Sequence, residues 1–242
     1  MDEGKDNRRL LLISNSTLHG SGYLDHCEPM IRDFMGKNKR ILFVPYARPS
    51  GMTHDDYAKK AYERFDKMGI RLDSIHQCDS TSYRAVRNAE AIFIGGGNTF
   101  VLLNSLQKSG IVGDIAERIR EGMPYIGTSA GANVAGKTIM TTNDMPIAYP
   151  ESFDAMGAVP FIINPHYIDP VPDSKHMGES RETRIREYHV FNSDPVVALR
   201  EGAMLRVEGD KMELAGTTNA RLFMQDQEAI EYAPGSDLSF LL

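Results

Sequence analysis

The segment Gly127-Thr128-Ser129-Ala130-Gly131 matches the G-x-S-x-G pattern that surrounds a nucleophilic serine. An apolar run precedes it and small residues that can begin a helix follow it, as the strand, sharp turn and helix of such a site require. The glycines leave the serine oxygen open to a substrate, and the first N–H groups of the helix face developing negative charge. A turn without chemistry would have the same spacing. The strand and helix around the turn favour Ser129 as a nucleophile that attacks a carbonyl carbon.

A second glycine cluster, residues 95–97, follows an apolar strand and precedes a helix expected from Thr99. Open α/β sheets bind ligands at this edge, where the carboxyl ends of the strands lie. The glycines serve either close packing of helix on sheet or the exposure of backbone N–H groups to an oxyanion. With Ser129 as nucleophile, the N–H groups of Gly97 and Ala130 form the natural pair of donors. The cluster is not a dinucleotide fingerprint, because Phe100 stands where G-x-G-x-x-G needs its last glycine.

A serine attacks a carbonyl only when a base takes its proton, and histidine is the usual base because it titrates near neutral pH. Of the seven histidines, His166 is the strongest candidate because it follows a strand at residues 161–164 and the rigid Pro165. An ordinary loop histidine would have the same neighbours. The acid that orients the base has two candidates. Asp144 would give the chain order Ser, acid, His, and Glu201 would give Ser, His, acid. Either residue could instead belong to a turn, Asp144 in an Asx-turn and Glu201 exposed to water.

The stretch around Ser129 also fits the phosphate-loop pattern G-x-x-x-x-G-K-[ST] at residues 131–138. Such a loop needs a strand directly before its first glycine and a helix that begins at the lysine. Here Ser129 and Ala130 precede Gly131, and residues 139–146 have poor helix propensity. The sequence also offers no apolar strand ending in an aspartate that could hold magnesium. The serine nucleophile is therefore favoured over nucleotide binding, and no cofactor is expected.

The composition excludes several classes of protein. The 242 residues are 41% hydrophobic and 25% charged, with a mean hydropathy of -0.34, which is typical of a soluble globular protein. A net charge of -6 predicts no binding to nucleic acid or acidic membranes. Cys27 and Cys78 have no zinc-site spacing, so neither a metal nor a disulfide framework is expected. No apolar run approaches the ~18 residues of a membrane span and the N-terminus is charged, which predicts a cytoplasmic protein.

Short apolar runs alternate with amphipathic stretches of helix length through the first two-thirds of the chain. Strands are expected at residues 10–13, 40–44, 72–76, 91–94 and 123–126. Helices are expected at residues 24–35, 53–68 and 83–88, with a pair between 99 and 121. Strands that are apolar on both faces, and connections long enough for parallel pairing, indicate a central sheet covered by helices. The fold class is therefore α/β, with a doubly wound, mostly parallel sheet flanked by helices.

The last third of the chain has a different pattern. Prolines break any long helix between residues 137 and 172. One helix is expected at residues 179–189, and strands at 196–199, 203–207, 211–214 and 220–223, with a hairpin turn at Gly209-Asp210. These additional C-terminal antiparallel strands either extend the sheet or form a small cap. No linker separates them from the rest, so residues 1–242 are expected to form a single α/β domain.

Several of these segments together resemble the aspartyl dipeptidases called peptidase E, which are serine hydrolases on a class I glutamine-amidotransferase-like α/β fold. The resemblance extends over nearly the whole chain. It is carried by five blocks: residues 12–17 (LISNST), 95–100 (GGGNTF), 125–133 (YIGTSAGAN), 141–146 (TTNDMP) and 163–166 (INPH). Amidotransferases have a cysteine nucleophile and a base in an H-x-E pattern, whereas this chain has Ser129 and, after His166, Tyr167 and Ile168. The differences argue against glutamine hydrolysis.

The resemblance implies hydrolysis of small peptides with an N-terminal aspartate, with Ser129 as nucleophile, His166 as base and either Asp144 or Glu201 as acid. It also implies that Asn98 and Arg181 bind the substrate. Cyanophycinases share the serine-type fold and an aspartyl substrate, so a hydrolase of other aspartyl peptides is the alternative, and a non-catalytic small-molecule-binding relative is the contrasting class. Thr128 departs from an aromatic residue that some relatives have before the nucleophile, which would alter the shape of the site and not its chemistry.

An aspartate side chain needs a positive partner in a protein that is acidic overall. The strongest basic cluster runs from Lys175 to Arg186, and within it Arg181 matches the family pattern. A guanidinium can hold a carboxylate through two parallel hydrogen bonds. Alternating Glu and Arg at helical spacing also make solvated surfaces with i,i+4 ion pairs. Arg181 is preferred as the ligand over Arg184 and Arg186.

Overall fold

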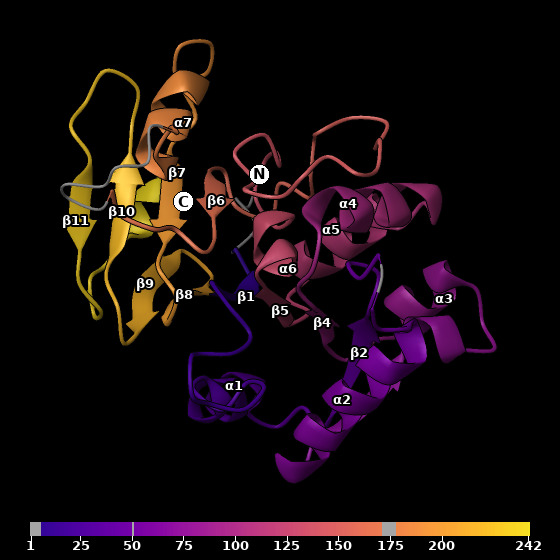
Figure 1. Cartoon of the computed structure of the whole chain (residues 1–242). Helices are drawn as coiled ribbons and strands as arrows, with labels where there is room; N and C mark the ends of the chain where they lie inside the picture. Colours follow the sequence, from indigo (N-terminus) through magenta and orange to yellow (C-terminus); the bar gives the residue numbers. More distant parts are fainter. Residues whose placement is uncertain (1–5, 50, 171–177) are drawn as a thin grey trace, which may run out of the picture.

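Within residues 6–49, 51–170 and 178–242, which the computed structural model describes, seven strands form the largest sheet (Figure 1). They are β1 (Arg9–Ile13), β2 (Arg40–Val44), β3 (Arg71–Ser74), β4 (Ile92–Ile94), β5 (Tyr125–Thr128), β8 (Ala203–Glu208) and β9 (Lys211–Gly216). Their order across the sheet is β3-β2-β4-β5-β1-β8-β9. The five strands from β3 to β1 are parallel, while β8 and β9 add an antiparallel edge. The carboxyl ends of β4, β5 and β1 therefore lie at one edge.

Helices cover both faces of this sheet, because its strands alternate buried apolar side chains toward each face. The helices α1 (Glu28–Met35) and α2 (His54–Lys67) cover one face. The other face carries α3 (Ser82–Arg87), α4 (Thr99–Lys108) and α5 (Val112–Arg120). On β1, Leu11 and Ile13 pack toward the first pair, and Leu10 and Leu12 toward the second group. This is the doubly wound arrangement that the sequence predicts.

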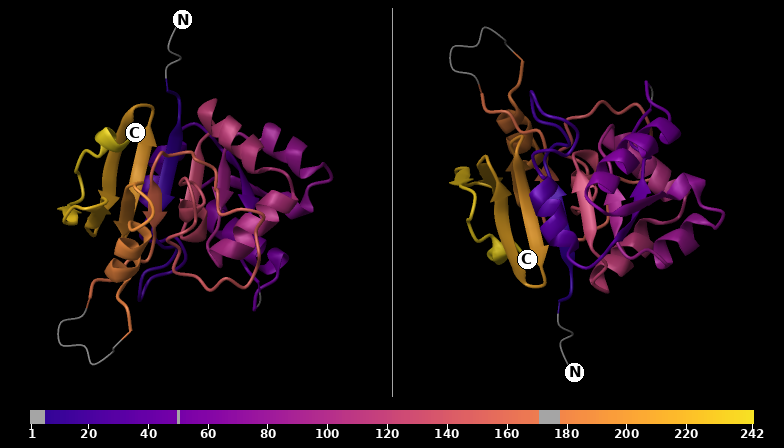
Figure 2. Two further views of the ribbon diagram at one scale, coloured as in Figure 1. Left: turned by 90° about the horizontal axis from the view of Figure 1, so that it is seen from above. Right: turned by 90° about the horizontal axis from the view of Figure 1, so that it is seen from below.

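Four more strands of the described part form a second sheet in the order β11-β10-β7-β6. They are β6 (Ile162–Asn164), β7 (Val196–Leu199), β10 (Ala220–Phe223) and β11 (Ile230–Tyr232). One face shares a buried cluster with the large sheet through Ile163, Val197 and Leu199. The helix α7 (Arg181–Tyr188) covers the other face. Figure 2 shows these C-terminal elements on one side of β1 and the helices from α2 to α5 on the other.

The expected elements agree with the structure in kind and differ at several bounds. The strand expected at residues 123–126 is β5, which runs from Tyr125 into the turn at Ser129. The strand expected at residues 72–76 ends at Ser74, because Ile75–Gln77 forms the 3-10 helix η1. The C-terminal strands do both things expected of them, since β8 and β9 extend the large sheet while β7 and β10 belong to the second one. The helix expected after Ser129 is the four-residue α6 (Ala130–Asn133), and the sequence analysis missed β11 and the 3-10 helix η2 (Ser239–Leu241).

Candidate active site

Ser129 lies at the sharp turn between β5 and α6, with backbone angles of φ 52° and ψ -113°. Residues other than glycine rarely adopt a positive φ. Backbone strain of this kind is concentrated at functional sites. The backbone holds the turn from both sides. The Ser129 N–H donates to the Ile13 carbonyl (2.9 Å), and the Ser129 carbonyl accepts from Ala132 and Asn133 (both 2.9 Å). The strand, turn and helix predicted for the nucleophile are therefore present.

The glycines around Ser129 allow backbones to approach each other closely. A Cβ atom at Gly127 would lie 2.4 Å from the Gly131 carbonyl oxygen, and one at Gly96 would lie 2.9 Å from Ser129 Cβ. The buried Tyr125 hydroxyl donates to the same Gly131 carbonyl at 2.6 Å. The turn thus packs against β4 and the loop after it, and that loop passes directly beside the serine.

Gly131→Ala is expected to lower the free energy of unfolding by about 3 kcal/mol, because its Cβ would lie only 2.2 Å from the Ile94 carbonyl oxygen. That neighbour is backbone in the middle of the sheet and cannot rotate away. Gly113→Ala is the matched control, because that helical position has open space around it and is expected to gain about 0.5–1 kcal/mol. Urea unfolding measures both variants. Wild-type stability in Gly131→Ala would contradict the close packing described for the turn.

His166 links the serine to a carboxylate. Its Nε2 lies 2.9 Å from Ser129 Oγ, and its Nδ1 lies 2.8 Å from Glu201 Oε1. The histidine follows β6, and Glu201 lies in the turn between β7 and β8, so three separate strand ends meet here. The side chains of His166 and Glu201 are 38% and 50% exposed, which leaves the hydroxyl–imidazole–carboxylate chain open to a substrate from solution.

The two contacts of His166 fix the roles of its ring nitrogens. An ionised carboxylate only accepts hydrogen bonds, so Nδ1–H donates to Glu201 and the unprotonated Nε2 accepts from the Ser129 hydroxyl. This is the geometry in which an imidazole can act as a general base toward a serine. The arrangement can therefore activate Ser129 without any other group.

Asp144 does not contact His166 in this structure. Its Oδ2 accepts from the Thr99 N–H at 2.7 Å and from the Thr99 hydroxyl at 2.6 Å, at the first turn of α4. A carboxylate at this position satisfies a free N–H group and interacts favourably with the helix dipole. Of the two acids that the sequence offers, the structure brings Glu201 to the imidazole, whereas Asp144 lies in a loop and binds the first turn of α4.

Of the expected oxyanion donors, Gly97 lies in the loop between β4 and α4, and Ala130 is the first residue of α6. Within the described residues, neither the Gly97 N–H nor the Ala130 N–H donates a hydrogen bond to a protein acceptor. Gly97 has a φ of 151°, and a Cβ there would lie 2.2 Å from the Ala47 carbonyl oxygen. Asn98 begins α4: its side chain accepts from the Val101 N–H (3.1 Å) and donates to the Met145 carbonyl (2.8 Å). The Asn98 side chain thus caps α4. A substrate that binds this side chain would have to compete with these two hydrogen bonds.

Arg181 is the first residue of α7, is partly buried, and forms no ion pair with the described residues. Burial lowers its pKa, as does the positive charge of Arg184, while the negative charge of Asp144 acts in the opposite direction. The other two candidates are engaged: Arg184 lies near Glu179, and Arg186 contacts Glu182 and Glu228. Lys175, the start of the expected basic cluster, lies outside the described residues.

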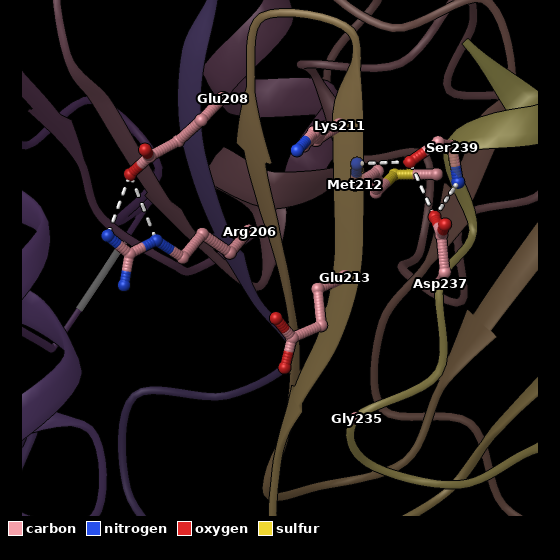
Figure 3. A pocket seen from close by; sticks show the side chains of 8 residues that line it. All are labelled: Arg206, Glu208, Lys211, Met212, Glu213, Gly235, Asp237 and Ser239. Atoms are coloured by element: carbon pink, nitrogen blue, oxygen red, sulfur yellow. Dashed lines mark hydrogen bonds and ion pairs between the residues drawn. The ribbon is translucent and has the colours of Figure 1, made fainter.

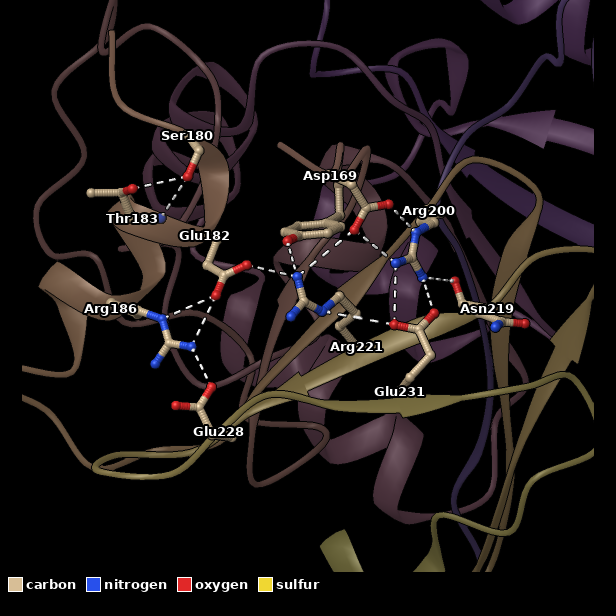
Figure 4. Close-up of polar contacts among 11 residues, drawn as sticks. Asp169, Ser180, Glu182, Thr183, Arg186, Arg200, Asn219, Arg221, Glu228 and Glu231 are labelled. Atoms are coloured by element: carbon tan, nitrogen blue, oxygen red, sulfur yellow. Dashed lines mark hydrogen bonds and ion pairs between the residues drawn. The ribbon is translucent and has the colours of Figure 1, made fainter. Parts of the chain in front are cut away.

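A network of charged residues joins the segment of His166 to the start of α7 (Figure 4). Arg221 donates to the Tyr167 hydroxyl at 2.9 Å and to Glu182 at 2.7 Å, and these two residues follow His166 and Arg181 in the chain. Beside it, Arg200 contacts Asp169 at 2.7 Å and lowers the pKa of that carboxyl. Exposed ion pairs are weak singly and matter more in networks. This network connects the residue after His166 to the first turn of α7, where Arg181 lies.

Other possible sites are less well formed. The phosphate-loop alternative fails because α6 ends at Asn133, no helix begins at Lys137, and the Lys137 ammonium pairs with Asp194. A cavity of about 450 Å³ between β8, β9 and the C-terminal segment contains none of the expected site residues (Figure 3). Among the described residues, no group of three or more His, Cys, Asp or Glu side chains could hold a metal ion. No helix in this part of the chain is long and apolar enough to cross a membrane.

The sequence analysis passed over two residues of the site, Ser14 and Asn15. Both are buried and polar, and both come directly after the apolar strand β1. The Ser14 hydroxyl accepts from the His166 N–H at 2.9 Å, and the Asn15 Oδ1 accepts from the Gly202 N–H at 2.8 Å. Polar residues immediately after a buried strand, at the edge where ligands bind, were the signal that could have identified them.

The chain resembles known peptidases along its length. The model of peptidase family S51 matches residues 10–215. A probable alpha-aspartyl dipeptidase of Drosophila melanogaster is 47% identical over 238 residues, covering 97% of this chain and 98% of that protein. Peptidase E of Streptomyces coelicolor is 46% identical over 233 residues, covering 96% and 94%. The crystal structure of a peptidase from an acI-B1 actinobacterium has the same fold, with a TM-score of 0.71 at 16% identity, covering 98% of this chain and 99% of that one. The chain therefore belongs to peptidase family S51.

Proposed function

We propose that this peptidase hydrolyses dipeptides with an N-terminal aspartate through an acyl-enzyme on Ser129. The observation that carries the proposal is the hydrogen-bonded chain from Ser129 Oγ through His166 to Glu201. The strained turn that presents the serine supports it, because such strain is maintained only where the surrounding structure requires it. The names of the Drosophila and Streptomyces relatives support the aspartyl dipeptide as substrate.

In the first half of the reaction, Ser129 Oγ attacks the peptide carbonyl carbon while His166 Nε2 takes the hydroxyl proton. The carbonyl oxygen becomes an oxyanion, which accepts hydrogen bonds from the Gly97 and Ala130 N–H groups. Glu201 stabilises the imidazolium through Nδ1–H. When the intermediate collapses, the C–N bond breaks and His166 gives its proton to the leaving amine, so that the second residue departs and aspartyl-Ser129 remains.

In the second half, a water molecule takes the place of the amine. His166 removes a proton from the water as the oxygen attacks the ester carbon, and the same N–H groups hold the second oxyanion. The C–O bond to Ser129 then breaks and His166 returns the proton to the serine oxygen. Free aspartate leaves and the starting state is restored, with no net change in protons on the enzyme.

Arg181 is assigned to the aspartate side chain. It is partly buried, it forms no ion pair with the described residues, and the charged network around Arg221 holds its helix beside His166. Burial lowers the pKa of Arg181, and a carboxylate bound against its guanidinium would offset this effect and stabilise the charged form, as the negative charge of Asp144 does in part. Specificity for an acidic first residue then follows from one guanidinium.

A panel of Asp-Leu, Glu-Leu, Asn-Leu and Ala-Leu tests this function, with kcat and KM measured for the wild type and Arg181→Met. The wild type is expected to prefer Asp-Leu. In Arg181→Met, KM for Asp-Leu is expected to rise about 10- to 100-fold. This increase corresponds to the loss of a hydrogen bond between charged groups, which contributes about 1.5–3 kcal/mol. KM for Ala-Leu is expected to stay the same. Methionine keeps the unbranched stem of the arginine side chain and removes the guanidinium.

Arg184→Met is the matched control, because Arg184 lies on the same helix and its side chain is 58% exposed. A wild type that cleaves no dipeptide of the panel would contradict the proposed function. Preference for longer aspartyl peptides would favour the cyanophycinase-like alternative. If Arg181→Met weakened Asp-Leu and Ala-Leu equally, or if Arg184→Met had the same effect, the assignment of Arg181 would be wrong.

A further inference from the structure

Three consecutive residues at the end of β1, Ile13 to Asn15, each accept a hydrogen bond from a segment that carries one residue of the proposed catalytic chain. The Ile13 carbonyl accepts from the Ser129 N–H at 2.9 Å. The Ser14 hydroxyl accepts from the His166 N–H at 2.9 Å. The Asn15 Oδ1 accepts from the N–H of Gly202, the residue after Glu201, at 2.8 Å. The nucleophile, the base and the acid are thus each tied to the same short stretch of chain.

Ser14 is fully buried and has both of its hydrogen-bonding functions in use. Its hydroxyl donates to the Leu199 carbonyl at 2.9 Å, which directs an oxygen lone pair toward the His166 N–H. The same Leu199 carbonyl accepts from the Tyr167 N–H at 2.9 Å. His166 has a φ of 54°, a conformation that histidine adopts infrequently. Ser14 therefore stabilises the unusual backbone that aims the imidazole at Ser129.

Asn15 acts in the same way on the acid. It is 1% exposed, its Nδ2 donates to the Thr17 carbonyl at 2.9 Å, and its Oδ1 faces Gly202. Gly202 has a φ of 91°, so the turn that presents Glu201 depends on a backbone geometry suited to glycine. The Glu201 carbonyl is held by the Thr218 hydroxyl at 2.8 Å. The Asn15 side chain thus adds a link between this turn and the end of β1, beside the Ser14 N–H that donates to the Ala203 carbonyl at 3.0 Å.

These links start at the end of β1 in the large sheet and reach segments that follow strands of the second sheet. Ser129 follows β5, which pairs directly with β1, and His166 follows β6 of the second sheet. Glu201 lies in the turn that leads from β7 of the second sheet to β8 of the large sheet. We propose that Ser14 and Asn15 are positioning residues that set the alignment of Ser129, His166 and Glu201 across the two sheets. This inference rests on the proposed function, and neither residue needs to touch the substrate.

The test compares Ser14→Ala, Ser14→Cys and Asn15→Leu with wild type by kcat and KM for Asp-Leu and by the rate at which a fluorophosphonate labels Ser129. Misplacement of a catalytic group by about 1 Å costs on the order of 100-fold in rate. We expect Ser14→Ala and Asn15→Leu to lower kcat and the labelling rate about 10- to 100-fold, with KM changed less than about twofold. Ser14→Cys, whose thiol keeps weaker forms of both hydrogen bonds, should lose less activity and remains measurable if the alanine variant does not fold.

Two controls separate positioning from general destabilisation. Ser74→Ala removes a buried hydroxyl that bonds His76 at the end of β3, and Asn192→Leu removes an amide that donates to the Tyr188 carbonyl. The inference would be overturned if all three test variants kept the labelling rate and kcat of the wild type. It would also be overturned if the control variants, at the same Tm as the test variants, lost as much kcat and labelling rate as they do. A wild-type protein that the fluorophosphonate does not label would overturn the proposed function as well. Labelling that is equally fast in wild type and variants overturns the positioning role alone.

Discussion

Ser129→Ala is expected to reduce kcat for Asp-Leu by about 10⁴-fold or more, because the reaction then loses its covalent intermediate. Water would have to attack the peptide directly, with only the oxyanion donors and substrate binding left to assist it. In serine proteases these leave about 10³- to 10⁴-fold catalysis over water. KM should change little, since the serine oxygen contributes mainly to the chemical step. Steady-state hydrolysis and labelling by a fluorophosphonate measure the effect.

Ser105→Ala is the control for this experiment. The Ser105 hydroxyl donates to the Val101 carbonyl within α4 and is not part of the catalytic chain. Its alanine variant should keep wild-type turnover and labelling. Near-normal hydrolysis of Asp-Leu by Ser129→Ala would exclude the acyl-enzyme mechanism. Absence of labelling in a well-folded wild type would favour the non-catalytic binding protein instead.

Glu201→Gln is expected to lower kcat about 10²- to 10⁴-fold, with the larger value known from the corresponding change in serine proteases. The neutral amide can present its N–H groups to Nδ1 and so favour the wrong tautomer, in which Nε2 carries the proton and cannot accept from Ser129. An amide also stabilises an imidazolium less than a carboxylate does. The half-exposed position of Glu201 lets water replace part of the lost interaction, which sets the lower end of the range.

Asp144→Asn is the matched comparison, because it makes the same chemical change at the other acid that the sequence offers. Asp144 contacts Thr99 at the start of α4, so its variant should lose about 1 kcal/mol of stability and keep kcat within about threefold of wild type. The charge of Asp144 acts on Arg181, so a change in KM is compatible with this role. The assignment is reversed if Asp144→Asn loses kcat while Glu201→Gln does not. Full activity in both variants would discard both acids.

The local parts of the fold and site were predictable from the sequence because short-range signals determine them. The runs at residues 41–44 and 196–199 are apolar throughout, and the structure has strands there at Arg40–Val44 and Val196–Leu199. The turn at Ser129 is marked by glycines whose positions admit no side chain. Pro165 and a preceding apolar run identified His166 among seven histidines. The family was predictable for the same reason, since its motifs lie in these turns.

The choice between Asp144 and Glu201 was not predictable, because each follows the nucleophile in the chain at a plausible place for a turn. The decision depends on the antiparallel pairing of β8 with β1, which brings the turn between β7 and β8 beside the end of β1, and on the packing of the second sheet, which carries His166. The same limit applies to the pairing of β6 with β7 and to β11, a three-residue strand of mostly exposed residues. Contacts between distant segments follow from packing and leave little trace in local patterns.

The order of the proposed nucleophile Ser129 and its proposed activating groups His166 and Glu201 along the chain has a consequence for the division of the chain. A break anywhere between α6 and β6 would leave the nucleophile on one fragment and both activating groups on the other. Neither fragment alone would contain all three residues of the proposed catalytic chain. Activity after such a break would therefore require that the two fragments associate. A shift of the second sheet against the first by about 1 Å would displace His166 from Ser129 and cost on the order of 100-fold in rate, while each sheet stayed intact.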